Sequence, residues 1–185
     1  LRISTASAGN DHRLGACEAP PAIISIFLGD ELTAIVDSLI SESEYHAAAK
    51  KDLEIGVSVL PKFPQDNTDR NRTSPFAFTG NKFEFRSLGA SASIAETNVT
   101  LNTIVADVLM HFADELEQAE DFRTALHDLI VRSLRDHNRV IFNGNGYADA
   151  WVEEAARRGL PNYASTVDAL PHLLDEKNVA LFSRH

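Results

Sequence analysis

The chain has a single cysteine, Cys17, among its 185 residues. One cysteine cannot form an internal disulfide bond, so the sequence excludes a disulfide-stapled fold and favours a reducing, cytoplasmic setting. N-glycosylation requires a secreted chain, and we therefore interpret the two sequons, at Asn71 and Asn98, as accidental.

Long apolar runs and an excess of basic residues are also missing. No stretch approaches the roughly 20 apolar residues that a helix needs to cross a bilayer, and no signal peptide is recognisable, so we expect no membrane partner. The chain has 17 Lys and Arg against 27 Asp and Glu, a formal net charge of -10 at pH 7. This balance argues against non-specific nucleic-acid binding but is compatible with a small anion in a local basic pocket.

The remaining composition is that of one ordinary domain. Hydrophobic residues make up 44% of the chain and charged residues 24%, which excludes disordered and fibrous classes. A chain of 185 residues is long enough to bury a sizeable core.

The first half of the chain alternates between loop and strand patterns. Residues 1–21 predict a loop, 22–28 a buried strand and 55–59 a half-buried strand. Between the strands, Asp30 is expected to cap a helix, because apolar residues follow it at the spacing of one helical face. These residues are Leu32, Ile35, Val36, Leu39 and Ile40.

From Thr100 onwards the apolar period changes to that of a helix. An uninterrupted apolar stripe over residues 101–116 predicts a long helix, whose stripe we interpret as core. Residues 122–134 repeat the pattern in a second helix, expected to be antiparallel to the first. A short helix closed by Gly159 and a last helix with a capping box at Ser165 follow. The sequence thus predicts an α+β chain, with a β-rich region at 1–98 and a helical region at 99–185.

The most informative stretch runs from Asn71 to Arg86. Its second half alternates strictly between charged and aromatic residues, and side chains on a strand have a period of two. A turn signal at 79–81 precedes this strand, and a further alternating pair precedes the turn, so we predict a β-hairpin. The expected charged face carries Lys82, Glu84 and Arg86, and the expected aromatic residues are Phe76, Phe78, Phe83 and Phe85.

The hairpin is also a candidate anion site. Arg70 and Arg72 add two cations at its start, against the acidic balance of the whole chain. A lone Lys-x-Glu-x-Arg pattern is more commonly a solvated strand face, and that alternative stays open at this stage. Without Arg70 and Arg72, a solvated strand face would be the better interpretation.

Two blocks of sequence carry a resemblance to a known family. They are His-Arg-Leu-Gly-Ala-Cys-Glu-Ala-Pro at 12–20, and Asn-Arg-Thr at 71–73 followed by Lys-Phe-Glu-Phe-Arg at 82–86. The first is similar to the Arg-Leu-x-Pro-Gly-x-Glu-Ala-Pro loop of glutamine synthetases, and the second to their Asn-Arg-Ser segment and Arg-Ile-Glu-Phe-Arg strand. A helical insertion near 30–48 and the large helical region resemble the type III branch. The resemblance implies part of an antiparallel β-barrel catalytic domain followed by a helical region.

By this resemblance, the reaction would be the ATP-dependent ligation of ammonia to glutamate through γ-glutamyl phosphate. The cofactors would be ATP with Mg or Mn, and the assembly a homo-oligomer, a stacked-ring dodecamer. Phosphoryl transfer depends mainly on cations and metal ions placed around the phosphate oxygens, which suits the residue types of the hairpin.

The resemblance also implies a role for each matching residue. Arg72 matches an arginine that stabilises the transferring phosphoryl group, and Lys82 stands where the family has an arginine that contacts ATP phosphates. Glu84 matches a carboxylate ligand of the metal ion, which suits a hard, oxygen-preferring cation. Arg13 and Arg86 match arginines that hold glutamate, and Glu18 matches a loop carboxylate that accepts a proton from ammonium.

The chain departs from the family pattern in one important respect. The other metal ligands, which the family carries on earlier strands, are not visible, and a hard cation wants about six oxygen ligands. We therefore expect the chain to be a fragment of a longer synthetase, inactive by itself. Two alternatives are a non-catalytic scaffold whose helical region mediates subunit contacts, and a related ligase that joins another amine to glutamate.

Overall fold

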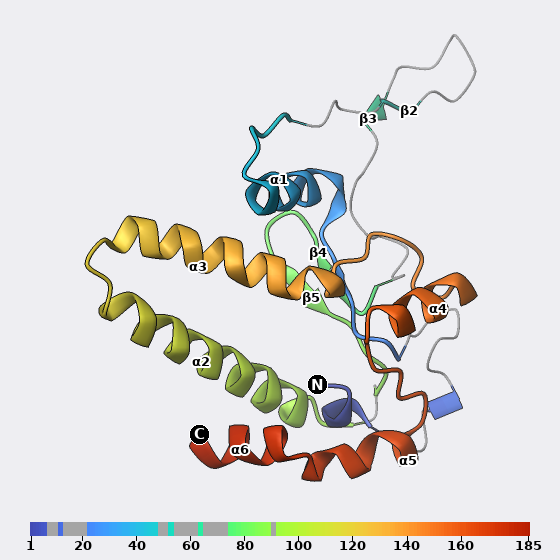
Figure 1. Cartoon of the computed structure of the whole chain (residues 1–185). Helices are drawn as coiled ribbons and strands as arrows, with labels where there is room; N and C mark the ends of the chain where they lie inside the picture. The colour runs from blue at the N-terminus through green and yellow to red at the C-terminus, as the bar shows by residue number, and fades with distance from the viewer. Residues whose placement is uncertain (7–10, 13–21, 48–51, 54–62, 65–73, 90–91) are drawn as a thin grey trace.

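The computed structural model describes residues 1–6, 11–12, 22–47, 52–53, 63–64, 74–89 and 92–185. The described part is a mixed α+β structure, mostly helical, with a three-stranded sheet and a separate two-stranded ladder (Figure 1). The elements are η1 (Ile3–Thr5), β1 (Ile26–Phe27), α1 (Gly29–Ser41), β2 (Asp52–Leu53), β3 (Phe63–Pro64), β4 (Phe76–Phe78), β5 (Phe83–Phe85), α2 (Ala95–Glu117), α3 (Phe122–His137), η3 (Asn138–Val140), α4 (Asp149–Arg157), α5 (Thr166–Ala169), η4 (Leu170–Leu174) and α6 (Glu176–Arg184).

The three-stranded sheet has the order β1-β4-β5. β1 runs parallel to β4, and β4 pairs antiparallel with β5, with Ala77 opposite Glu84. The predicted hairpin is therefore confirmed, as is the mixed α+β class. The expected antiparallel barrel is wrong for the described chain, because barrel closure requires more strands than this sheet, whose members are two or three residues long. The expected strand at 55–59 lies outside the described residues.

The N-terminus of α1 is capped from a distant segment. The side-chain Oδ1 of Asn143 accepts hydrogen bonds from the backbone N–H groups of Leu28 and Gly29, both at 3.0 Å. Its Nδ2 donates to Thr33 Oγ1 at 2.7 Å. The helix begins one residue before Asp30, so the prediction that Asp30 is the cap is wrong; Asp30 lies in the first turn instead.

Helices α2 and α3 form the predicted antiparallel hairpin (Figure 1). Asp121 caps α3 by accepting from the N–H groups of Arg123 and Thr124. The prediction that the α2 stripe is core is wrong for this chain: no residue of α2 is buried, and Val105 and Leu109 are 53% and 58% exposed. Helix α2 contacts α3, α6 and η1, which leaves part of its apolar surface without cover from the described residues.

The core lies where the segment before β1, the end of η3 and α4 meet. Its buried residues Ile23, Trp151, Ala155 and Leu160 are packed against Val140 and Phe142. The rings of Phe142 and Trp151 stack with centroids 3.8 Å apart.

The C-terminal helices begin and end largely as the local signals predict. Gly159, at φ 67°, closes α4, and the Ser165 hydroxyl accepts from the N–H of Asp168 at the start of α5. The sequence did not predict α6 as a separate helix. None of the described helices has the length and apolar content to span a bilayer.

Candidate functional site

The charged face of the hairpin is held in place by its backbone and by its opposite, aromatic face. The N–H of Thr79 donates to the carbonyl of Lys82 at 2.9 Å across the turn, and the N–H of Arg86 donates to the carbonyl of Pro75 at 2.7 Å. On the aromatic face, the Phe83 ring lies 5.8 Å from that of Phe76 and 5.2 Å from that of Phe78, measured between centroids. Such cross-strand aromatic pairs fix the strand register, and thereby the direction of the charged side chains.

Lys82, Glu84 and Arg86 come together as the strand period predicts. Lys82 Nζ lies 3.3 Å from Glu84 Oε1, and Arg86 Nη2 lies 3.3 Å from Glu84 Oε2. The side chains are exposed by 64%, 37% and 18% in the same order. One carboxylate is thus bridged by two cations, with the guanidinium the most sheltered of the three groups.

The two cations also set the ionisation of the carboxylate. Hydrogen bonding to Lys82, and then to Arg86, holds the pKa of Glu84 below its ordinary value. Glu84 is therefore ionised at neutral pH, and the trio carries a net charge of +1. This combination can present carboxylate oxygens to a hard cation and positive charge to a carboxylate or phosphate.

The carboxylate fits a divalent ion as one ligand of several. Mg²⁺ and Mn²⁺ prefer oxygen donors, which Glu84 supplies, but they want about six of them. Within the described part of the chain, no three His, Cys, Asp or Glu side chains form a group that could hold a metal ion. Any further protein ligands would have to come from other residues.

The remaining predicted site residues fall outside the described ranges. Arg13, Glu18, Arg70 and Arg72 belong to segments for which the structure gives no placement. Their roles, like those assigned to Lys82, Glu84 and Arg86, stay predictions.

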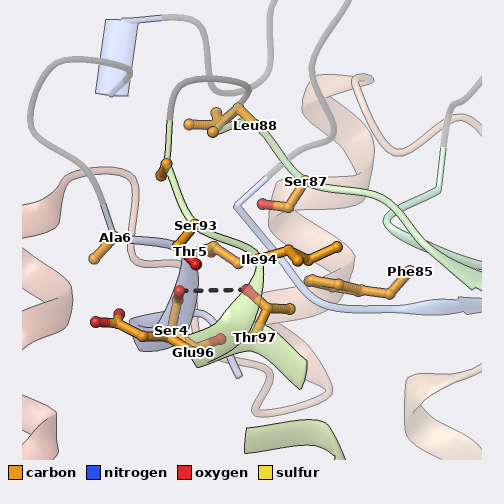
Figure 2. Close-up of a pocket in the computed structure, with 12 residues that line it drawn as sticks. Ser4, Thr5, Ala6, Phe85, Ser87, Leu88, Ser93, Ile94, Glu96 and Thr97 are labelled. Carbon is orange, nitrogen blue, oxygen red and sulfur yellow. Dashed lines mark hydrogen bonds between the residues drawn. The ribbon is translucent and has the colours of Figure 1, made fainter. Parts of the chain in front are cut away.

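A pocket of about 440 Å³ lies beside β5 and has no counterpart in the sequence predictions (Figure 2). It lies between the N-terminal turn, the segment after β5 and the start of α2. Phe85 extends toward Ile94 at one side, and the hydroxyl of Thr97 donates to the carbonyl of Ser4 at 3.4 Å. Ser4 and Thr97 lie 93 positions apart in the chain, so no local sequence signal could have paired them.

Comparison with known proteins gives relatives along the whole chain. The chain is 48% identical to the type-3 glutamine synthetase of Dictyostelium discoideum over 186 residues, which cover 99% of this chain and 25% of the relative. It is 45% identical to the glutamine synthetase of Butyrivibrio fibrisolvens over 194 residues, covering 100% and 26%. For the glutamine synthetase of Bacteroides fragilis (strain YCH46), the identity is 42% over 188 residues, covering 98% and 26%.

A family model described as glutamine synthetase C-terminal domain matches residues 125–185. The chain spans about a quarter of the length of the curated relatives it matches. The resemblance carried by the blocks at 12–20 and 71–86 is thereby confirmed, since the similarity extends over nearly the whole chain. The chain belongs to the glutamine synthetase family.

Proposed function

We propose that this chain supplies one wall of a glutamine synthetase active site and acts as part of a longer polypeptide. The reaction is the ATP-dependent ligation of ammonia to glutamate through γ-glutamyl phosphate, in the cytoplasm. The observation that carries the proposal is the Lys82–Glu84–Arg86 trio, a bridged carboxylate between two cations. It lies in a chain 42–48% identical to glutamine synthetases.

Each member of the trio has a distinct task in this proposal. Glu84, ionised at neutral pH, is one ligand of a Mg or Mn ion, which when bound neutralises charge on the phosphate oxygens. Lys82, the most exposed of the three, contacts ATP phosphates as a mobile point charge. The Arg86 side chain is largely shielded from solvent, and its planar guanidinium can donate two parallel hydrogen bonds. In this proposal it holds a carboxylate of glutamate.

Three residues outside the described ranges complete the proposed chemistry. Arg72 stabilises the transferring phosphoryl group, Arg13 holds glutamate, and Glu18 accepts a proton from ammonium, which must lose one before nitrogen can attack. These roles rest on the matching sequence blocks at 12–20 and 71–73.

The test is glutamine formation by the complete gene product that contains this chain. We expect ATP- and ammonia-dependent release of glutamine and phosphate. We also expect Arg86→Lys to raise the KM for glutamate by about tenfold, since lysine keeps the charge but loses the two-pronged contact. Glu115→Gln is the matched control: it removes another ion-paired carboxylate, bonded to Arg132 across α2 and α3, and should leave the KM unchanged.

Two outcomes contradict the proposal. One is a wild-type protein that forms no glutamine with ammonia; formation of a γ-glutamyl amide from another amine, such as methylamine, would then favour a related ligase. The other is an Arg86→Lys variant whose KM for glutamate matches that of the wild type.

A second candidate function is assembly, favoured by the exposed apolar surface of α2. Val105 and Leu109 are more than half exposed, which is unusual for residues on a long apolar stripe. We propose that this surface contacts a second copy of the polypeptide in a homo-oligomer, with the stacked-ring dodecamer as the expected form. Light scattering of the complete protein tests this: Leu109→Lys should reduce the oligomer mass, and Asn102→Lys, which adds the same charge at an exposed polar position of α2, should not. An unchanged mass in Leu109→Lys would contradict a role in assembly.

A further inference from the structure

The two oxygens of the Glu84 carboxylate are each held by a different cation. Lys82 Nζ lies 3.3 Å from Oε1, and Arg86 Nη2 donates to Oε2 at 3.3 Å. A Mg or Mn ion at Glu84 would therefore meet a carboxylate that already serves two positive groups. Either all three cations tolerate one another at this carboxylate, or one side chain gives up its oxygen.

A divalent ion and an ammonium group cannot share one carboxylate oxygen at low cost. A Mg ion lies about 2.1 Å from an oxygen ligand, so on Oε1 it would lie within about 5.4 Å of Lys82 Nζ. At that distance a double charge repels a single charge twice as strongly as two single charges repel each other. An exposed ion pair contributes little to stability, so this repulsion exceeds the attraction that holds Lys82 at Glu84.

Lys82 is the cation that leaves Glu84 at the lower cost. Its side chain is 64% exposed, against 18% for Arg86, so its ammonium group is solvated by water when it swings away from the carboxylate. Lysine also has a flexible stem, whereas a guanidinium is a rigid planar group. Arg86 can therefore keep its contact with Oε2 while Lys82 moves.

The backbone at Lys82 does not have to move with the side chain. Its carbonyl accepts hydrogen bonds from the Thr79 N–H at 2.9 Å and from the Thr79 hydroxyl at 3.3 Å, which closes the turn before β5. The next residue, Phe83, packs its ring against two further phenylalanines on the other face of the strand. The exchange is thus confined to one side chain, and Glu84 keeps its place on β5.

We infer that Lys82 is an exchangeable counter-ion of Glu84: it pairs with Oε1 in the absence of a divalent ion, releases that oxygen when the ion binds, and then offers its ammonium group to the phosphates of ATP. The inference rests on the proposed role of Glu84 as a metal ligand. It adds an order of events to that role, in which Lys82 becomes available to the nucleotide once Glu84 holds a metal ion.

The experiment measures the Mn²⁺ affinity of the complete gene product by calorimetry without nucleotide, together with the KM for ATP. Lys82→Met should bind Mn²⁺ about two- to fivefold more tightly, because no exposed ion pair has to be broken. Its KM for ATP should rise by about tenfold, since a charged contact with phosphate is lost. A variant that merely disturbed the hairpin would weaken both.

Lys82→Arg separates displacement from simple repulsion between charges. Arginine keeps the charge but can hold a carboxylate through two hydrogen bonds, so it should release Glu84 less readily and weaken Mn²⁺ binding by about two- to fivefold. Repulsion alone would give the wild-type affinity, because the charge is unchanged.

Lys177→Met is the matched control. It removes the same charge as Lys82→Met from an exposed position on α6. Both the Mn²⁺ affinity and the KM for ATP should stay at their wild-type values.

The outcomes separate the inference from the proposed function. If Glu84→Gln binds Mn²⁺ like the wild type, Glu84 is not a metal ligand, and the proposed site fails together with the inference. If Glu84→Gln binds Mn²⁺ more weakly but Lys82→Met gains no affinity, or Lys82→Arg matches the wild type, the exchange is overturned while the proposed function stands. Equal gains in Lys82→Met and Lys177→Met would also overturn the exchange, since they would reflect net charge alone.

Discussion

Gly144 is the position where one added methyl group should disturb the centre of the fold. A Cβ built there would lie 2.5 Å from Cζ and 2.9 Å from Cε2 of Phe142, closer than real Cβ contacts come. Gly144 has no positive φ, so the cost of Gly144→Ala comes from overlap with the ring rather than from backbone conformation. The ring cannot retreat freely because it is stacked on Trp151, which is almost fully buried.

The cost follows from what the Phe142 segment holds together. Moving the ring weakens an aromatic pair worth about 0.5–1.5 kcal/mol, and overpacking a tight site costs about 1–3 kcal/mol. The segment also carries the hydrogen bond from the Phe142 N–H to the carbonyl of Ile26, at 2.9 Å. We therefore expect Gly144→Ala to lower the free energy of unfolding by about 2 kcal/mol.

Tryptophan fluorescence of the 185-residue chain in urea is a direct assay, because Trp151 is its only tryptophan. Phe142→Leu lacks the Cζ and Cε atoms that meet the added methyl group, so it provides a double-mutant cycle. Gly144→Ala should cost much less in the Phe142→Leu background than in the wild type. Strictly additive costs would refute the overlap, and a solvent-exposed emission of Trp151 in the native wild-type chain would refute the packing itself.

Three further predictions concern the Asn143 cap of α1, a buried and an exposed leucine, and the loss of stability in acid. Asn143→Ala should destabilise the protein by about 1–2 kcal/mol in urea titrations, because it removes the cap of α1; a cost near zero would contradict that role. Leu129→Ala, at a buried position of α3, should lower the free energy of unfolding by about 2–5 kcal/mol. Leu109→Ala, at an exposed position of α2, should lower it in the isolated chain by about 0.5 kcal/mol or less. Equal losses in the two variants would contradict the burial pattern. The backbone N–H of Thr166, and also its hydroxyl, donate hydrogen bonds to the Asp11 carboxylate and lower the pKa of Asp11 in the folded state. The stabilising effect of Asp11 is therefore complete above the ordinary aspartate value of about 3.9 and is lost as the pH falls through the folded pKa. The difference in melting temperature between wild type and Asp11→Asn should therefore be largest near neutral pH and shrink below about pH 3.9; a difference independent of pH would contradict the charge-assisted bonds.

The features that the sequence predicts correctly depend on residues close together in the chain. The hairpin follows from a period of two within a few residues, and the Ser165 cap from a spacing of three. The end of α4 at Gly159 follows from one residue that tolerates positive φ. Local spacing is enough for such features because their hydrogen bonds are themselves local.

The features that the sequence does not predict depend on distant partners. Asn143 caps α1 from 114 positions away, and no local spacing could have identified it in place of Asp30. The α2 stripe identifies an apolar helix face but not what covers it, so its interpretation as core was wrong for this chain. For the site, the strand period predicts that Lys82, Glu84 and Arg86 meet, whereas nothing local indicates the hydrogen bonds between Asp11 and Thr166.

Mn²⁺ binding to the complete gene product, monitored by calorimetry or electron paramagnetic resonance, tests directly whether the charged face of the hairpin holds a metal ion. If Glu84 is a metal ligand, Glu84→Gln should weaken Mn²⁺ binding by at least about tenfold, because a neutral amide replaces a charged oxygen donor. Glu115→Gln should bind like the wild type, since its carboxylate pairs only with Arg132 among the contacts described for it. Unchanged Mn²⁺ affinity in Glu84→Gln would contradict the claim that the charged face of the hairpin is a wall of the active site.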